Sequence, residues 1–252
     1  MKLEQARATD ELVPIPTRGR TFASRRAVRL ADADPYGRLR LDAIARFLQD
    51  AAIEDVDETG WGTPHHLWFV RSMRVDVLAP FVQDRHVDLV TWCSGLAALA
   101  AGRRWSVTGD AGGRVEVDSV WIHLDADARP ARIEDFGVYA EATGGRPVST
   151  RLTLADPGDA GAPGATVPWP LRATDVDRHG HVNNAVHWQA VEHVLGGGGP
   201  DLRRPLRVRL DYRDPIDLGE DVVLAVARED ERTTIALRAG GRAKAIAVAE
   251  PL

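Results

Sequence analysis

The two halves of this chain repeat one pattern, and the repetition restricts the possible folds more than any other feature. Four residues of the first half recur in the second half in the same order and at the same spacing: Arg29, Asp32, Asp34 and Gly37 correspond to Arg172, Asp175, Asp177 and Gly180. The motif Ala-Gly-Gly-Arg also occurs twice, at residues 111–114 and 239–242. Because the matches keep their order and drift only as loop lengths change, they indicate an internal duplication.

Irregular segments mark the limits of the two units. Residues 155–166 (Ala-Asp-Pro-Gly-Asp-Ala-Gly-Ala-Pro-Gly-Ala-Thr) have the composition of a linker. Residues 1–20 are polar and without a hydrophobic period, so we interpret them as an irregular lead-in. The sequence therefore predicts an N-terminal unit at residues 21–154 and a C-terminal unit at residues 167–252.

Each unit is predicted to contain one helix followed by several strands. In the first unit Leu41, Ile44 and Leu48 recur at helical spacing, Asp42 can cap the start and Gly60 ends the helix. The second helix is expected at about 183–195, and strand-like runs at 68–78, 85–93, 103–108, 115–124, 206–212, 221–227, 233–237 and 243–248. This order predicts an α+β fold in which a curved antiparallel sheet wraps each helix.

Composition excludes several functional classes. The net charge of −5 argues against a protein whose whole surface binds nucleic acid. The polar start and the absence of a long apolar run argue against a membrane protein. The single cysteine, Cys93, cannot form an internal disulfide, and its strand-like surroundings favour a buried structural thiol. We expect a cytoplasmic protein.

The segment most informative about chemistry precedes the second helix. Asp177, His179 and His181 alternate at a spacing of two, so an extended loop could place their side chains on one face. Asn183 or Asn184 can cap the helix that starts there. The helix start would present free N–H groups and a positive dipole end, which stabilise a carbonyl that gains negative charge.

Other interpretations of this segment remain open. It could be a polar turn that only caps the helix. Two histidines and a carboxylate could bind iron or zinc, although we prefer a site without metal or organic cofactor. Glu192, further along the helix, could support the site or be a solvated charge. The first unit has Arg38 where the second has His181, so we predict that it has lost the catalytic residues.

The segment Asp-Val-Asp-Arg-His-Gly-His-Val-Asn-Asn, residues 175–184, resembles the signature of the acyl-ACP thioesterases, a family of double hotdog proteins. The resemblance extends over nearly all of residues 22–250. It implies a tandem double hotdog with a catalytic C-terminal half and an N-terminal half that binds the acyl chain. Apolar candidates for the chain-binding surface are Ile44, Phe47, Leu48 and Ile53, for each of which core packing is the alternative.

The resemblance implies hydrolysis of the fatty acyl thioester of acyl carrier protein (ACP), a step of fatty acid biosynthesis. Asp177 and His181 match the catalytic aspartate and histidine of the family, and Asn183 and Asn184 complete the segment. His179 stands where the plant enzymes have asparagine. A Glu-Cys pair of the plant enzymes falls here on Pro215 and Ile216, which removes the cysteine nucleophile and implies attack by water.

The resemblance also implies partners. ACP is acidic, so binding it requires an arginine-rich surface. Candidates for that surface are the pairs Arg25-Arg26, Arg103-Arg104 and Arg203-Arg204, the last with Arg207. We expect a homodimer. The alternatives are an acyl-CoA thioesterase, an acyl-binding hotdog protein without catalysis and, on weaker grounds, a hotdog dehydratase.

Overall fold

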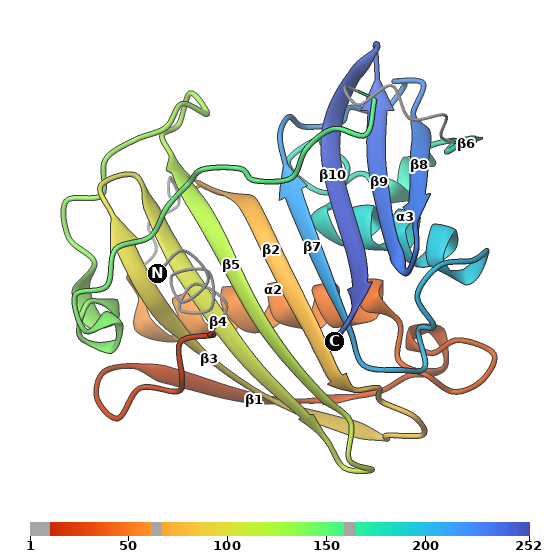
Figure 1. Ribbon diagram of the computed structural model, residues 1–252. Coiled ribbons are helices and arrows are strands. Elements are labelled where there is room, and N and C mark those ends of the chain that lie inside the picture. The colour runs from red at the N-terminus through yellow and green to blue at the C-terminus, as the bar shows by residue number, and fades with distance from the viewer. Residues whose placement is uncertain (1–10, 62–66, 159–164) are drawn as a thin grey trace, which may run out of the picture.

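The computed structural model describes residues 11–61, 67–158 and 165–252, which form one ten-stranded antiparallel sheet with two long helices on one face (Figure 1). The strands are β1 (Thr21–Ala27), β2 (Leu67–Ala79), β3 (His86–Ala97), β4 (Ala100–Gly109), β5 (Arg114–Leu124), β6 (Ala165–Pro168), β7 (Leu206–Tyr212), β8 (Val223–Glu229), β9 (Arg232–Ala239) and β10 (Arg242–Pro251). The helices are α2 (Leu41–Thr59) and α3 (Asn184–Gly196). The α+β class expected from the sequence is observed.

The strand order of the second half is the reverse of that of the first. The sheet runs β1-β3-β4-β5-β2 and continues as β7-β10-β9-β8-β6. β2 and β7 join the halves by antiparallel pairing, with Val75 opposite Val208. This order is the one expected of two copies of a unit that meet along one strand.

Both helices bury an apolar face against the sheet. In α2, Leu41, Ile44 and Leu48 are at most 3 % exposed, and Gly60 ends the helix with a positive φ of 61°. The prediction that Asp42 caps α2 is wrong. The N-cap residue is Arg40, whereas Asp42 lies in the first turn, fully buried, and pairs with Arg40 and Arg46.

The α3 helix begins at the predicted Asn183 cap, whose Oδ1 accepts a hydrogen bond from the Ala185 N–H at 2.9 Å. Trp188 of α3 is fully buried against β7, and its indole N–H donates to the Tyr212 hydroxyl at 2.9 Å. One hydrophobic cluster contains residues of both helices and of strands from both halves. The two halves therefore share a core.

Eight of the described strands agree with the predicted runs to within a few residues, and β7 has the predicted limits, whereas β1 and β6 correspond to none of the predicted runs. The two Ala-Gly-Gly-Arg motifs lie between β4 and β5 and between β9 and β10, and Gly112 and Gly240 have positive φ of 102° and 55°. β6 overlaps the last two residues of the predicted linker, of which residues 159–164 lie outside the described part. None of the described helices is long and apolar enough to cross a membrane.

Candidate active site

The predicted catalytic segment forms a tight loop between the short helix η4 (Ala173–Asp175) and α3. The Asp177 N–H donates to the His181 carbonyl and the Gly180 N–H to the Asp177 carbonyl, both at 3.0 Å. Gly180 has a φ of 84°, which favours glycine. The first half has the same loop: the Asp34 N–H donates to the Arg38 carbonyl at 2.8 Å and the Gly37 N–H to the Asp34 carbonyl at 2.9 Å.

The Asp177 carboxylate is half-buried and fixed on both oxygens. Its Oδ1 accepts the His179 backbone N–H at 2.9 Å, and its Oδ2 accepts the Asn183 side-chain amide at 3.1 Å. Because the same Asn183 caps α3, it holds Asp177 at a fixed place beside the helix start. The structure thus brings Asp177, Asn183 and Asn184 together.

His181 is oriented by an aspartate that the sequence analysis did not identify. The His181 Nδ1 lies 2.6 Å from the Asp217 Oδ1, and the two side chains are 49 % and 60 % exposed. A hydrogen bond of 2.8 Å from the Val182 N–H to the Ile216 carbonyl brings the two segments together. The sequence carries only a small signal for this residue: Asp217 directly follows Pro215 and Ile216, which stand where the plant enzymes have the Glu-Cys pair.

The His179 side chain lies apart from this cluster. It is exposed, and its Nε2 faces the Arg178 side chain at 3.4 Å, so only its backbone N–H reaches Asp177. Over residues 11–61, 67–158 and 165–252 the structure contains no group of three His, Cys, Asp or Glu side chains placed to hold a metal ion. The alternation of Asp177, His179 and His181 therefore does not gather the three side chains on one face.

The start of α3 is braced from inside the core. The Tyr212 hydroxyl donates to the Asn184 carbonyl at 3.4 Å, and the His187 Nδ1 lies 3.3 Å from the Asn183 carbonyl. His187 is 4 % exposed, and burial lowers its pKa to about 4, so it is neutral near pH 7. These contacts fix the peptide groups at the helix start.

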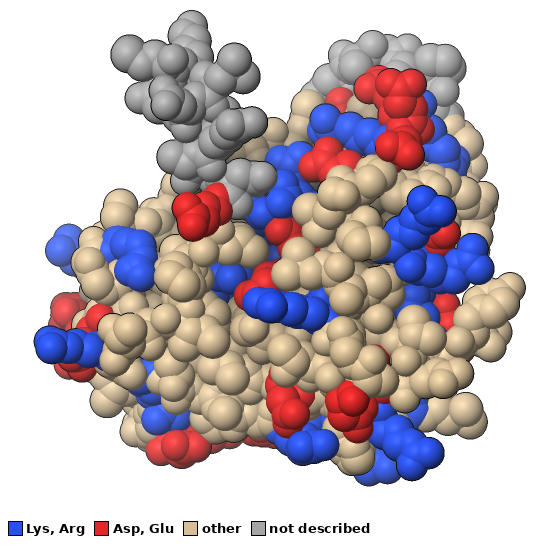
Figure 2. All heavy atoms as spheres, turned by 60° about the horizontal axis from the view of Figure 1, so that its bottom comes forward, with Lys and Arg blue, Asp and Glu red and all other residues tan. Residues whose placement is uncertain are grey.

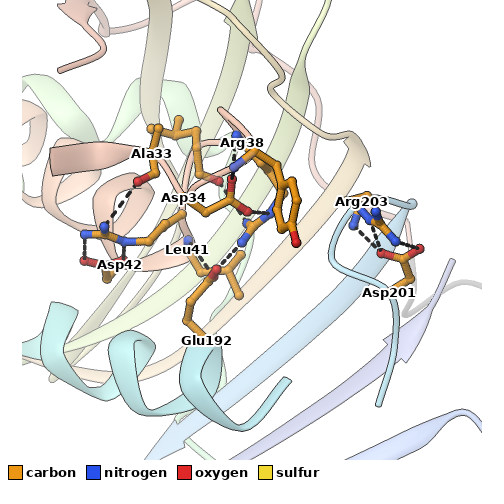
Figure 3. A network of polar contacts seen from close by, with 11 residues as sticks. Ala33, Asp34, Arg38, Leu41, Asp42, Glu192, Asp201 and Arg203 are labelled. Carbon is orange, nitrogen blue, oxygen red and sulfur yellow. Dashed lines mark hydrogen bonds and ion pairs between the residues drawn. The ribbon is translucent and has the colours of Figure 1, made fainter. Parts of the chain in front are cut away.

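Glu192 belongs to α3 of the second half, but its side chain lies beside Arg38 of the first half rather than beside His181 (Figure 3). Its Oε1 pairs with the Arg38 guanidinium, which also binds Asp34 at 3.1 Å, and its Oε2 accepts the Leu41 N–H at 3.1 Å. The sequence suggests that Glu192 supports the loop that contains Asp177 and His181. The structure instead places its carboxylate at the equivalent loop of the first half. In the first half, a carboxylate occupies the helix start.

The predicted acyl-binding residues do not share one surface. Ile44 and Leu48 are in the core, Phe47 is half-buried and Ile53 is 42 % exposed. Ile44 borders a cavity beside Arg38 of about 10 Å³, which has room for about one water molecule and not for an acyl chain. The Cys93 thiol is buried, and burial raises its pKa to about 11, as expected of a structural residue.

Most of the arginines suggested for docking already pair with carboxylates. Arg104 is 2 % exposed and binds Glu116, Arg207 binds Asp76, and Arg103 binds Asp55. Figure 2 shows basic and acidic side chains intermixed on the face it presents. Arg203 and Arg204 also pair with a carboxylate, that of Asp201, but their side chains are the most exposed of these paired arginines, at 65 % and 82 %.

The antiparallel sheet wrapped around its helices, with an Asp and a His beside a helix N-terminus, places the protein in the hotdog class. The chain belongs to the acyl-ACP thioesterase family: the family model for the N-terminal domain matches residues 19–138, and that for the C-terminal domain matches residues 164–245. The chain is 30 % identical over 223 residues to an uncharacterized protein of Mycobacterium tuberculosis, covering 87 % of this chain and 88 % of the other. Family membership supports hydrolysis of acyl thioesters.

Solved structures show the same fold at low sequence identity. The 12:0-ACP thioesterase from Umbellularia californica has a TM-score of 0.72 at 17 % identity and covers 91 % of this chain and 96 % of that one. An acyl-ACP thioesterase from Bacteroides thetaiotaomicron has a TM-score of 0.72 at 16 % identity, with 91 % and 97 % covered. A Lactobacillus plantarum protein assigned as an oleoyl thioesterase has a TM-score of 0.77 at 18 % identity, with 95 % and 98 % covered.

Proposed function

We propose that the protein hydrolyses the thioester between a fatty acyl chain and ACP, without a metal or organic cofactor. The single observation that carries the proposal is the loop before α3, where Asp177, the His181–Asp217 pair and the helix start lie together. This combination supplies a base, a polar group for water and donors for an oxyanion. It is the chemistry that attack of water on a thioester requires.

The roles follow from the hydrogen bonds. Asp217 accepts a hydrogen bond from the His181 Nδ1–H, which leaves the Nε2 free to take a proton from water. Asp177, held by Asn183, positions that water. The water oxygen bonds to the thioester carbon, the carbonyl oxygen becomes negative beside the Asn184 N–H, and collapse expels the thiolate. His181 then returns the proton to the thiolate sulfur, so the products are a fatty acid and a thiol.

Two substitutions test this assignment. We expect Asp177→Asn to lower kcat and His181→Ala to abolish turnover, while the fold and acyl binding persist, because both side chains lie in a surface loop. Hydrolysis of a series of acyl-ACPs, from short to long chains, measures kcat, and circular dichroism measures the fold. Parent-like turnover in either variant would remove the C-terminal site from the mechanism.

The carrier is tested separately, because the same site could act on acyl-CoA. We expect faster turnover of acyl-ACP than of acyl-CoA with the same chain, and a steep loss with salt for ACP only, since screening weakens protein–protein attraction. Equal turnover and equal salt dependence would favour CoA. Fatty acid that copurifies with a protein that hydrolyses no thioester would favour an acyl-binding protein.

A further inference from the structure

Gln49 of α2 occupies the position in the first half that Glu192 of α3 occupies in the second. Each residue follows the first residue of its helix, Leu41 or Asn184, at the same distance along the chain. The burial of the neighbours also agrees. Leu48 and Val191 are buried, Gln49 and Glu192 are half-buried, and Asp50 and His193 are exposed.

The first half shows where a side chain at this position points. Glu192 reaches across the helix pair, and its carboxylate accepts the N–H of Leu41, the first residue of α2. The loop before that helix has the same hydrogen bonds as the loop before α3, and its bridge between Arg38 and Val82 corresponds to the bridge between His181 and Asp217. If the two halves are equivalent here, the side chain of Gln49 is expected near the start of α3.

At the equivalent helix start of the second half, no carboxylate of the described residues accepts the first N–H of the helix. In the described part of the chain, neither the backbone N–H of Asn184 nor the side chain of Gln49 has a hydrogen-bond partner. Arg38 is 4 % exposed and blocks the first site, whereas the His181 side chain is 49 % exposed and held outward by Asp217. The start of α3 therefore has an N–H without an acceptor among the described residues and a neutral amide at the equivalent position of α2, whereas the first half has an N–H bound to a carboxylate.

We propose that Gln49 is a substrate-positioning residue of the second-half site, a role that rests on the proposed function. Its side-chain N–H donates to the thioester carbonyl oxygen beside the Asn184 N–H. In the first half, the equivalent helix start binds a negative oxygen, the Glu192 Oε2 on the Leu41 N–H. A neutral amide leaves the Asn184 N–H for substrate, whereas a carboxylate would occupy it. The active site thus contains residues of both halves.

The first experiment compares Gln49→Ala and Gln49→Glu with the parent. We expect kcat to fall roughly 100-fold or more in each variant, with KM changed less than about threefold, because the lost donor acts mainly on the transition state. Below the pKa of the new carboxyl group, Gln49→Glu should recover activity relative to Gln49→Ala. The control is Asp50→Asn, next along the helix and exposed, for which we expect parent-like kcat.

The second experiment needs no turnover. The probe is an acyl-ACP analogue in which CH₂ replaces the thioester sulfur and the carbonyl carbon is ¹³C. Its infrared carbonyl stretch should fall on binding to the parent and fall less in Gln49→Ala. Parent-like kcat and carbonyl shift in Gln49→Ala would overturn the inference and leave the proposed function intact. If the parent neither hydrolyses a thioester nor binds the analogue, the proposed function is wrong, and the inference falls with it.

Discussion

One side-chain difference separates the loop before α3, residues 177–181, from the equivalent loop before α2, residues 34–38. Arg38 and His181 follow equivalent glycines and make equivalent backbone bridges. The long guanidinium of Arg38 reaches Asp34 and Glu192 and fills its site. The shorter imidazole of His181 cannot span that distance and binds Asp217 at the surface instead. The identity of this residue therefore decides whether the side chain pairs with carboxylates inside the loop or with one at the surface.

The orientation of His181 by Asp217 leads to a prediction. Asp217→Asn removes the acceptor that fixes the Nδ1 proton, so we expect kcat to fall roughly 100-fold in steady-state hydrolysis, with little change in KM. Glu220→Gln is the matched control, because Glu220 contacts the Asp217 backbone N–H and not the imidazole. Equal kcat for Asp217→Asn and the parent would show that His181 needs no partner.

Helix starts and the contact between the two helices are the elements that organise the site. Asn183 caps α3 and holds Asp177, while Tyr212 and His187 brace the same turn from the core. Further along α3, the Glu192 carboxylate accepts the N–H of Leu41 at the start of α2. The two helices thus connect the loop that contains Asp177 and His181 to the equivalent loop of the first half.

Burial of His187 predicts a pH dependence of stability. Its folded pKa of about 4 lies below the ordinary value of 6.5, so between these pH values the unfolded chain binds a proton that the folded protein does not. The free energy of unfolding should therefore fall by about 3 kcal/mol as pH drops from about 6.5 to about 4. Urea unfolding of His187→Asn should lack this part of the slope.

The control for that measurement is His193→Asn, since His193 is an exposed histidine of the same helix. It should retain the slope of the parent. A parent-like slope in His187→Asn would instead assign the pH dependence to other groups.

The contact of Glu192 with Arg38 predicts a loss of stability. Glu192→Gln leaves the buried Arg38 with Asp34 as its only carboxylate, so we expect the free energy of unfolding to fall by about 1.5–3 kcal/mol in urea titrations. Glu54→Gln breaks an exposed pair with Arg26 and should cost less than about 0.5 kcal/mol. Equal losses in the two variants would contradict a special role for the buried pair.

At the scale of the whole molecule, one sheet and one core connect the two halves. The pairing of β2 with β7 removes an edge from each half. The remaining edges are protected: β1 carries Arg25 and Arg26, and β6 has four residues and ends at Pro168. Neither edge favours extension of the sheet into a neighbouring molecule.

The expected homodimer is tested by mass. We predict a mass near two chains in sedimentation equilibrium, with the contact formed by a surface other than the edges at β1 and β6. Arg25→Val with Arg26→Val should leave this mass unchanged if the β1 edge is outside the contact. The mass of a single chain would refute the dimer without affecting the proposed chemistry.

The sequence by itself determined the elements and the loop. Residue periodicity located both helices and most strands, and the Asn183 cap was predictable because capping and periodicity are local properties. The repeated Arg, Asp, Asp and Gly of the two loops predicted equivalent turns, since these residues make contacts within a few positions of one another. The signature that carries the family resemblance is the second of these loops, residues 175–184, and the resemblance extends over nearly all of residues 22–250.

The tertiary structure alone decided which side chains meet. Asp217 reaches His181, and Glu192 reaches Arg38 and Leu41, because strands and helices distant in sequence pack together. The sequence predicts that Asp42 caps a helix, but in the structure Asp42 lies inside the first turn, where it pairs with Arg40 and Arg46. Local sequence sets backbone preferences within a few residues, whereas contacts between segments depend on packing of the whole chain, which no local pattern specifies.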